Sequence, residues 1–131
     1  MEKKFFEALK TRRTHYGLTK DKIVSEDKIL EIVREAVTHT PSAFNSQSAR
    51  VVVLFDGQSE RLWEIVKEEL KKIVSAEAFK KTEEKVDGSF KSGYGTILFF
   101  EDMKVIEGLQ EKFPTYSDNF PIWSNQSAGM H

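Results

Sequence analysis

The chain has 131 residues, with 20 basic and 21 acidic side chains and a formal net charge of -1. This balance gives no electrostatic reason to expect nucleic-acid binding, which needs a basic face. The chain contains no cysteine, which excludes disulfides, thiolate chemistry and cysteine metal sites. No apolar run approaches the ~20 residues that span a bilayer, and the amino terminus lacks the apolar core of a signal peptide. We therefore expect one cytoplasmic domain over residues 1–131 without membrane partners.

Apolar periodicity predicts helices over residues 2–12, 26–39, 59–74 and 103–112, and helical composition predicts one over 76–86. The clearest is 26–39, which Ser25 should cap and in which Glu26 and Asp27 favour the first turn. Residues 56–58 read as a turn, after which Ser59 should cap the next helix. The glycine-rich residues 87–95 predict a flexible loop.

Two apolar runs, residues 50–55 and 96–100, predict buried strands. Residues 51–55 show no polar alternation, so we expect both faces of this strand to be covered, with helices on each side. Glu101 and Asp102 follow the second strand, but adjacent carboxylates on a strand point to opposite sides and chelate poorly. We therefore expect no metal site.

The segment between the helix at 26–39 and the first strand is rich in small and amide side chains. Pro41 ends the helix by restricting Thr40. Ser42, Asn45 and Gln47 then offer hydrogen-bond donors and acceptors of both kinds. Such a loop suits a planar ligand with a polar rim, although an ordinary polar loop has the same composition.

Arg12 and Arg13 follow the first predicted helix. Two guanidinium groups can grip a phosphate in a bidentate way, and Thr14 adds a hydroxyl donor. Alternatively, the arginines simply favour the negative end of the helix dipole.

Residues 113–123 hold four aromatic side chains and two prolines. Two interpretations remain open: a hydrophobic loop over the core, or an aromatic-walled lid beside a flat ligand. A last helix should begin at about residue 122.

Arg12-Arg13-Thr14 and the Pro41-Ser42-x-x-Asn45-x-Gln47 pattern resemble, in this order, the phosphate segment and the flavin-contacting loop of the nitroreductase family. With the strand at 93–102, the chain looks most like a small bacterial subgroup named for nitroreductases and fatty-acid repression. The resemblance covers essentially the whole chain but only the first part of the family domain. It implies an α+β fold of three α/β/α layers around a mostly antiparallel sheet, incomplete in this chain.

The resemblance also implies a function. The family passes hydride from NADH or NADPH through bound FMN to nitro compounds, quinones or similar acceptors, as a homodimer with its chemistry on the flavin and no catalytic side chain. The implied cofactor-binding residues share the two motifs: Arg12, Arg13, Thr14, Tyr16, Pro41, Ser42, Ala43, Asn45 and Gln47.

Two departures from the family pattern leave an alternative open. Ser48-Ala49-Arg50 stands where the family commonly has Pro-Trp after the glutamine. The later half of the family domain has no counterpart in the sequence, so residues 1–131 alone are not expected to form a competent flavin enzyme. The alternative is a non-catalytic interaction or regulatory module, or a dimerisation fragment, built on the same fold.

Overall fold

A computed structural model describes residues 4–131, which divide into two compact units. One unit combines the described residues up to Asp21 with Asp56–Tyr94, and the other combines Lys22–Phe55 with Gly95–His131. We call them the helical unit and the sheet unit and describe each by itself. Residues 2 and 3 of the first predicted helix lie outside the described residues.

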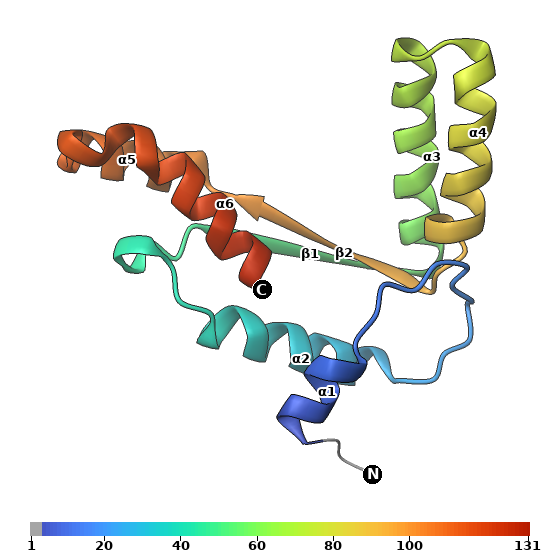
Figure 1. Cartoon of the computed structure of the whole chain (residues 1–131), viewed down its shortest axis with the longest axis horizontal. Helices are drawn as coiled ribbons and strands as arrows, with labels where there is room; N and C mark the ends of the chain where they lie inside the picture. Colours follow the sequence, from blue (N-terminus) through green and yellow to red (C-terminus); the bar gives the residue numbers. More distant parts are fainter. Residues whose placement is uncertain (1–3) are drawn as a thin grey trace. The chain divides into compact units, whose positions relative to one another are not determined.

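The helical unit is built on a pair of adjacent helices (Figure 1). Helix α1 spans Phe5–Thr11, α3 spans Asp56–Ile73, α4 spans Ala76–Val86, and a π-helical turn, η2, spans Asp87–Lys91. Ser75 caps α4 by accepting a hydrogen bond from the Ala78 N–H group. Trp63 of α3 stacks on Phe90 of η2 with ring centroids 5.0 Å apart, so η2 is packed against α3.

Two expectations for this unit are wrong. Helix α3 begins at Asp56 rather than Ser59, because Asp56 turns the chain within one residue at φ 44° while its N–H group donates to the Tyr94 carbonyl at 2.8 Å. Asp56 and Gly57 therefore belong to the helix, and Ser59 is a buried helical residue. Residues 87–91 form the η2 turn instead of a flexible loop.

The sheet unit contains a two-stranded antiparallel sheet of β1, Ala49–Phe55, and β2, Gly95–Glu101. The register runs from Ala49 opposite Glu101 to Phe55 opposite Gly95. At Gly95 a Cβ atom would lie 2.7 Å from the Leu54 carbonyl oxygen, so the close approach of the strands requires glycine there. The α+β class and the two predicted strands are thus confirmed.

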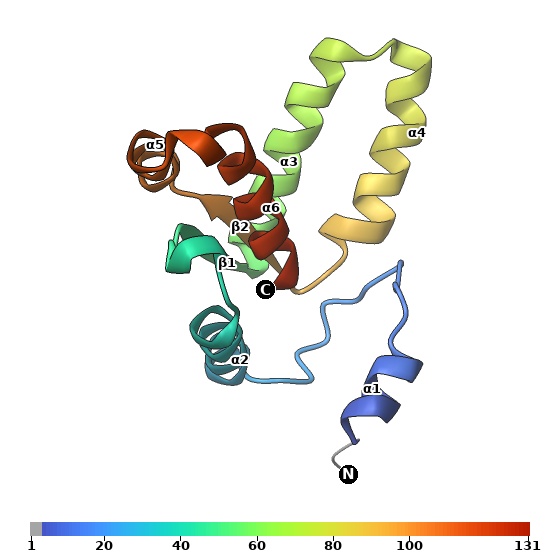
Figure 2. The same cartoon turned by 60° about the vertical axis from the view of Figure 1, so that its left-hand side comes forward.

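Helices α2 (Glu26–His39), α5 (Met103–Lys112) and α6 (Phe120–Met130) complete the sheet unit, with 3-10 turns η1 (Ala43–Asn45) and η3 (Pro114–Asn119). Helix α2 has the predicted bounds, and Ser25 caps it by accepting from the Lys28 N–H group. Helix α2 contacts β1, and α6 contacts both strands (Figure 2). Residues 114–123, expected as part of a loop or lid, are helical, and α6 begins at Phe120 rather than at residue 122.

Neither face of the sheet is fully covered within its own unit, contrary to expectation. Helix α2 lines a cavity together with Ala49, Val51 and Val53, which share one face of β1. On the opposite face, Val52 is 43% exposed and Phe100 is 50% exposed, and on the α2 face Ile97 and Phe99 are each 40% exposed. The uninterrupted apolar sequence of β1 is therefore not accompanied by burial of both of its faces.

Candidate functional site

The segment between α2 and β1 has an unusual backbone. Phe44, Asn45 and Gln47 take left-handed φ angles of 56°, 53° and 49°, although none of them is glycine. Such conformations are strained for L-residues and persist only where the surroundings hold them. Strain of this kind gathers at functional sites, which agrees with the predicted role of this loop.

Hydrogen bonds hold the loop at both ends. The Gln47 N–H group donates to the Ser42 hydroxyl at 3.0 Å, and an Arg50 guanidinium nitrogen donates to the Gln47 carbonyl at 2.9 Å. The Ser127 hydroxyl, buried in α6, donates to the Pro41 carbonyl at 2.9 Å. The loop is therefore fixed to itself, to β1 and to α6.

The Phe44 ring anchors the middle of the loop. Its centroid lies 5.0 Å from that of Phe113, 5.2 Å from Phe120 and 6.1 Å from Trp123, whose ring it faces at an interplanar angle of 15°. Aromatic pairs at these separations attract one another beyond simple burial. The aromatic residues at 113–123 thus hold the loop in place by packing around Phe44. The sequence alone did not indicate this role for Phe44. The cluster of aromatic residues downstream was the available signal.

Three of the predicted cofactor-binding side chains line one cavity of about 310 Å³. Ser42, Asn45 and Gln47 meet there with the end of α2, the start of β1 and His131. The lining residues that sequence reasoning did not select are Val37, Thr38, Thr40, Ala49 and His131. Pro41 and Ala43 instead line a neighbouring groove of about 420 Å³ beside Phe44 and Trp123. The structure therefore brings the predicted loop residues together on two sides of the loop.

Two buried polar groups in the sheet unit lack hydrogen-bond partners among the described residues. They are the carboxylate of Glu101, at both oxygens, and Nδ1 of His131. The His131 ring stacks on Phe99 with centroids 6.0 Å apart. An unsatisfied buried polar atom costs free energy, so both groups have unused capacity for a hydrogen bond.

The arginine segment lies in the helical unit and is exposed. Arg13 donates from one guanidinium nitrogen to the carbonyls of Lys10, at 3.0 Å, and Arg12, at 2.8 Å, so part of its capacity goes to the end of α1. Within the described part of the chain, no hydrogen bond or ion pair holds the Arg12 guanidinium. Tyr16 packs edge-on against Phe90 with centroids 6.5 Å apart. Arg12 is therefore the freer of the two arginines for an anionic group.

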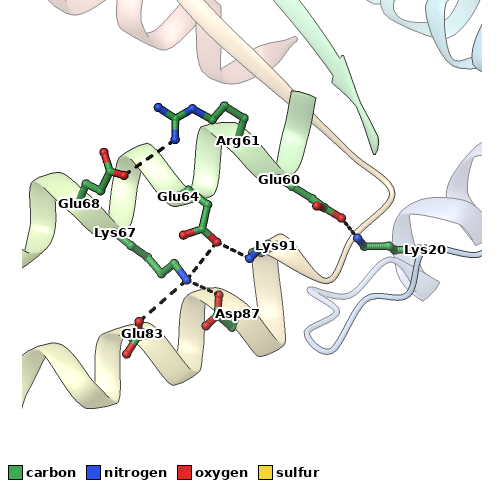
Figure 3. Close-up of polar contacts among 9 residues, drawn as sticks. All are labelled: Lys20, Glu60, Arg61, Glu64, Lys67, Glu68, Glu83, Asp87 and Lys91. Carbon is green, nitrogen blue, oxygen red and sulfur yellow. Dashed lines mark hydrogen bonds and ion pairs between the residues drawn. The ribbon is translucent and has the colours of Figure 1, made fainter. Parts of the chain in front are cut away.

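The largest group of charges in the helical unit joins its helices (Figure 3). The ammonium group of Lys67, almost fully buried, lies 2.8 Å from Asp87 and 3.2 Å from Glu64, and Glu64 also pairs with Lys91. Hydrogen bonds from Lys91 and then Lys67 lower the pKa of Glu64, while the hydrogen bond to Asp87 raises the pKa of Lys67. Each shift favours the charged form of a paired group, which indicates a structural ion-pair network rather than a catalytic one.

Among residues 4–131, no three His, Asp or Glu side chains are grouped so as to hold a metal ion. No helix in this part of the chain is both long enough and apolar enough to cross a membrane.

Comparison with known proteins matches residues 9–131 to the model of the nitroreductase family. The chain belongs to the nitroreductase family. The matched range includes both the arginine segment and the loop at Pro41. The family predicted from these motifs is therefore confirmed.

Individual relatives agree with this assignment. This nitroreductase-family chain is 32% identical over 127 residues to nitroreductase FRM2 of Saccharomyces cerevisiae, covering 95% of the chain and 62% of FRM2. Nitroreductase CinD of Lactococcus lactis, solved in complex with chloramphenicol, is 44% identical, with a TM-score of 0.81 over 97% of this chain and 63% of CinD. A nitroreductase structure from Saccharomyces cerevisiae is 30% identical, with a TM-score of 0.78 over 96% of this chain and 68% of that structure. The chain thus spans about 62% of the length of the curated relatives it matches.

Proposed function

We propose that the protein is an FMN-dependent oxidoreductase of nitroreductase type, which passes hydride from NADH or NADPH to nitro compounds, quinones or similar acceptors. The observation that carries the proposal is the strained loop at Phe44–Gln47, which presents Ser42, Asn45 and Gln47 to one cavity inside the range that matches the family. A homodimer in the cytoplasm is part of the proposal.

The chemistry of the loop fits a flavin ring. The ring edge of FMN carries carbonyl and imino groups, and the hydroxyl of Ser42 and the amides of Asn45 and Gln47 can both donate and accept. In the structure the side-chain amide of Gln47 donates one long hydrogen bond, 3.4 Å, to the side-chain oxygen of Asn45. These two amides therefore retain donors and acceptors for a ligand.

The arginine segment fits a phosphate. Arg12 has an exposed guanidinium without a partner in the described residues, and Thr14 is exposed beside it. Arginine forms short, charge-assisted and often bidentate hydrogen bonds to phosphate oxygens. The segment and the loop lie in different units, and each is proposed for its own part of the cofactor.

Bound FMN supplies the hydride chemistry, because its ring can accept a hydride and release it to a second substrate. The side chains of this protein would bind the FMN and orient its ring. Ser42, Asn45 and Gln47 would hold the polar edge of the ring, and Arg12, Arg13, Thr14 and Tyr16 would bind the phosphate. Pro41 and Ala43 line the apolar groove on the other side of the loop, beside Phe44 and Trp123, and would support the loop from that side.

We propose a flat aromatic compound as the acceptor class. The comparison supports this class: CinD, at 42% identity, has been solved with 4-nitrophenol and with nicotinic acid. We therefore propose nitroaromatic compounds as the first acceptors to assay.

The test is a fluorescence titration of FMN with the whole protein, followed by anaerobic reduction with NADH or NADPH. We expect saturable quenching and bleaching of the flavin band. Gln47→Ala should weaken FMN binding by about threefold to tenfold, the effect of one hydrogen bond, whereas Gln58→Ala, an exposed glutamine of α3, should not change it. No quenching by the whole protein would refute the proposal and favour the non-catalytic module.

A further inference from the structure

Gln47 is held on both sides of its backbone. Its N–H group donates to Ser42, at 3.0 Å, and its carbonyl accepts from Arg50, at 2.9 Å. The residue itself has a left-handed φ of 49°. Since a glutamine does not keep this conformation without restraint, these two hydrogen bonds fix the backbone from which its side chain projects.

Arg50 is held in turn. The nitrogen that reaches Gln47 also donates to the Ala49 carbonyl at 2.9 Å, and its other terminal nitrogen donates to Asp102 Oδ2 at 2.9 Å. The planar guanidinium can make all three contacts because its donors are fixed in a fork, which a lysine ammonium group cannot reproduce.

Asp102, which holds this arginine, is itself held in place by two further hydrogen bonds. Its other carboxylate oxygen caps α5 by accepting from the Lys104 N–H group at 3.1 Å, and its own N–H group donates to the Ser48 carbonyl at 2.9 Å. The end of β2 and the start of α5 are thereby connected through one arginine to the backbone of the loop.

We propose that Arg50, fixed by Asp102, is a positioning residue that aims Gln47 at the flavin ring. Arg50 lies in the Ser48-Ala49-Arg50 stretch that departs from the common Pro-Trp pattern, so this chain restrains its loop with a polar clamp. The inference rests on the proposed function. It assigns no contact between Arg50 and the cofactor.

The clamp is separable from folding. The side chain of Arg50 is 53% exposed and that of Asp102 is 33% exposed, and exposed ion pairs add little to global stability. Arg50→Lys should therefore loosen Gln47 while leaving the unfolding midpoint almost unchanged.

The first test is a double-mutant cycle on the dissociation constant of FMN in the whole protein. We expect Arg50→Lys to weaken FMN binding by about threefold to tenfold and by no more than Gln47→Ala does, but by less than about twofold when Gln47 is already alanine. Arg61→Lys is the matched control, because Arg61 has an exposed carboxylate, Glu68, at 3.9 Å and lies on α3. An equal loss in both backgrounds would show that Arg50 acts without Gln47 and overturn the inference.

The second test needs no cofactor and separates this inference from the proposed function. Hydrogen exchange of the Gln47 amide in the apoprotein should become about tenfold faster in Arg50→Lys and in Asp102→Asn, with the Val51 to Val53 amides unchanged. If the wild-type protein binds no FMN, the proposed function fails and faster exchange still supports the clamp. Unchanged exchange at Gln47 overturns the clamp whatever the flavin result.

Discussion

Arg12 and Arg13 are neighbours in the sequence, but their guanidinium groups have different surroundings. Arg13 donates to two carbonyls at the end of α1, whereas Arg12 has no such partner in the described residues. The helix-end alternative left open by the sequence therefore applies to Arg13, and phosphate binding by Arg12 stays a prediction. Side-chain direction at a helix end is a matter of local geometry that residue type alone does not determine.

Substitution of the two arginines should separate these roles. We expect Arg12→Ala to weaken FMN binding by about tenfold or more, because a charge-assisted hydrogen bond contributes roughly 1.5–3 kcal/mol, without changing apoprotein stability. Arg13→Ala should weaken FMN binding and also fray α1, which circular dichroism would detect. Arg61→Ala, an exposed arginine on α3, is the control for a simple loss of charge. Equal and small effects of both variants on FMN affinity would contradict a phosphate role.

At the scale of elements, the local sequence pattern was sufficient to predict a helix where residues close in the sequence determine the structure. The bounds of α2 were predicted from apolar periodicity and the Ser25 cap, and those of α4 from its helical composition. The π-helical turn at 87–91 was not, because Gly88 and Ser89 disfavour helix locally and the turn is held from α3. Lys67 bonds Asp87, Glu64 pairs with Lys91, and Trp63 stacks on Phe90. Single-sequence reasoning does not detect such distant contacts.

The candidate loop shows the same limit. Its polar side chains and its place between helix and strand were predicted, and three of its residues do share a cavity. Its left-handed backbone and its anchoring through Phe44 were not, because they depend on α6 and on Arg50, which lie elsewhere in the fold. The sequence thus indicated which residues could bind, and the packing determines how they are held.

Lys67 should be the key residue of the hairpin formed by α3 and α4. Lys67→Met keeps the aliphatic stem but leaves Asp87 and Glu64 without their shared cation, so we expect a loss of about 1–3 kcal/mol in unfolding free energy. Lys72→Met, on the same helix, removes an exposed pair with Glu69 and should cost less than about 0.5 kcal/mol. Urea unfolding followed by circular dichroism measures both. A loss no larger for Lys67→Met than for Lys72→Met would contradict the network's role.

The network also sets a pH window for the hairpin. The folded state lowers the pKa of Glu64 below its ordinary 4.5, so this contribution is present above pH 4.5 and is lost as pH falls through the folded value. The folded state raises the pKa of Lys67 above its ordinary 10.5, so that contribution is present below pH 10.5 and is lost as pH rises through the folded value.

We therefore expect unfolding free energy to fall at both extremes. Glu64→Gln should flatten the acid side more than the basic side, because Asp87, the largest cause of the raised pKa of Lys67, remains. Trp63 fluorescence in a Trp123→Phe background reports this unit, because Trp63 stacks on Phe90 beside the network. Glu69→Gln, from the exposed pair, is the control. An acid limb that is just as steep in Glu64→Gln would assign the pH dependence to other carboxylates.

At the scale of the whole molecule, the described residues contain little fully buried apolar surface. Val86, Ile106 and Phe120 are the only large apolar side chains among them that are fully buried. In the sheet unit, Val52 and Phe100 lie on the same open face of a sheet of two strands, with side chains 43% and 50% exposed. Sheets this small depend on further packing, and unpaired strand edges invite association with another chain.

We therefore expect the 131-residue chain to associate in solution at micromolar concentration, with the open face of the sheet as a contact surface. Phe100→Lys should shift the chain toward monomer, because it places a charge on this face where half of the side chain is already exposed and folding tolerates it. Phe6→Lys is the matched control, since Phe6 is 73% exposed in the helical unit. Sedimentation velocity measures the distribution, and circular dichroism confirms that each variant remains folded. A wild-type chain that sediments only as monomer would contradict the association, and equal effects of the two substitutions would remove the open face as its cause.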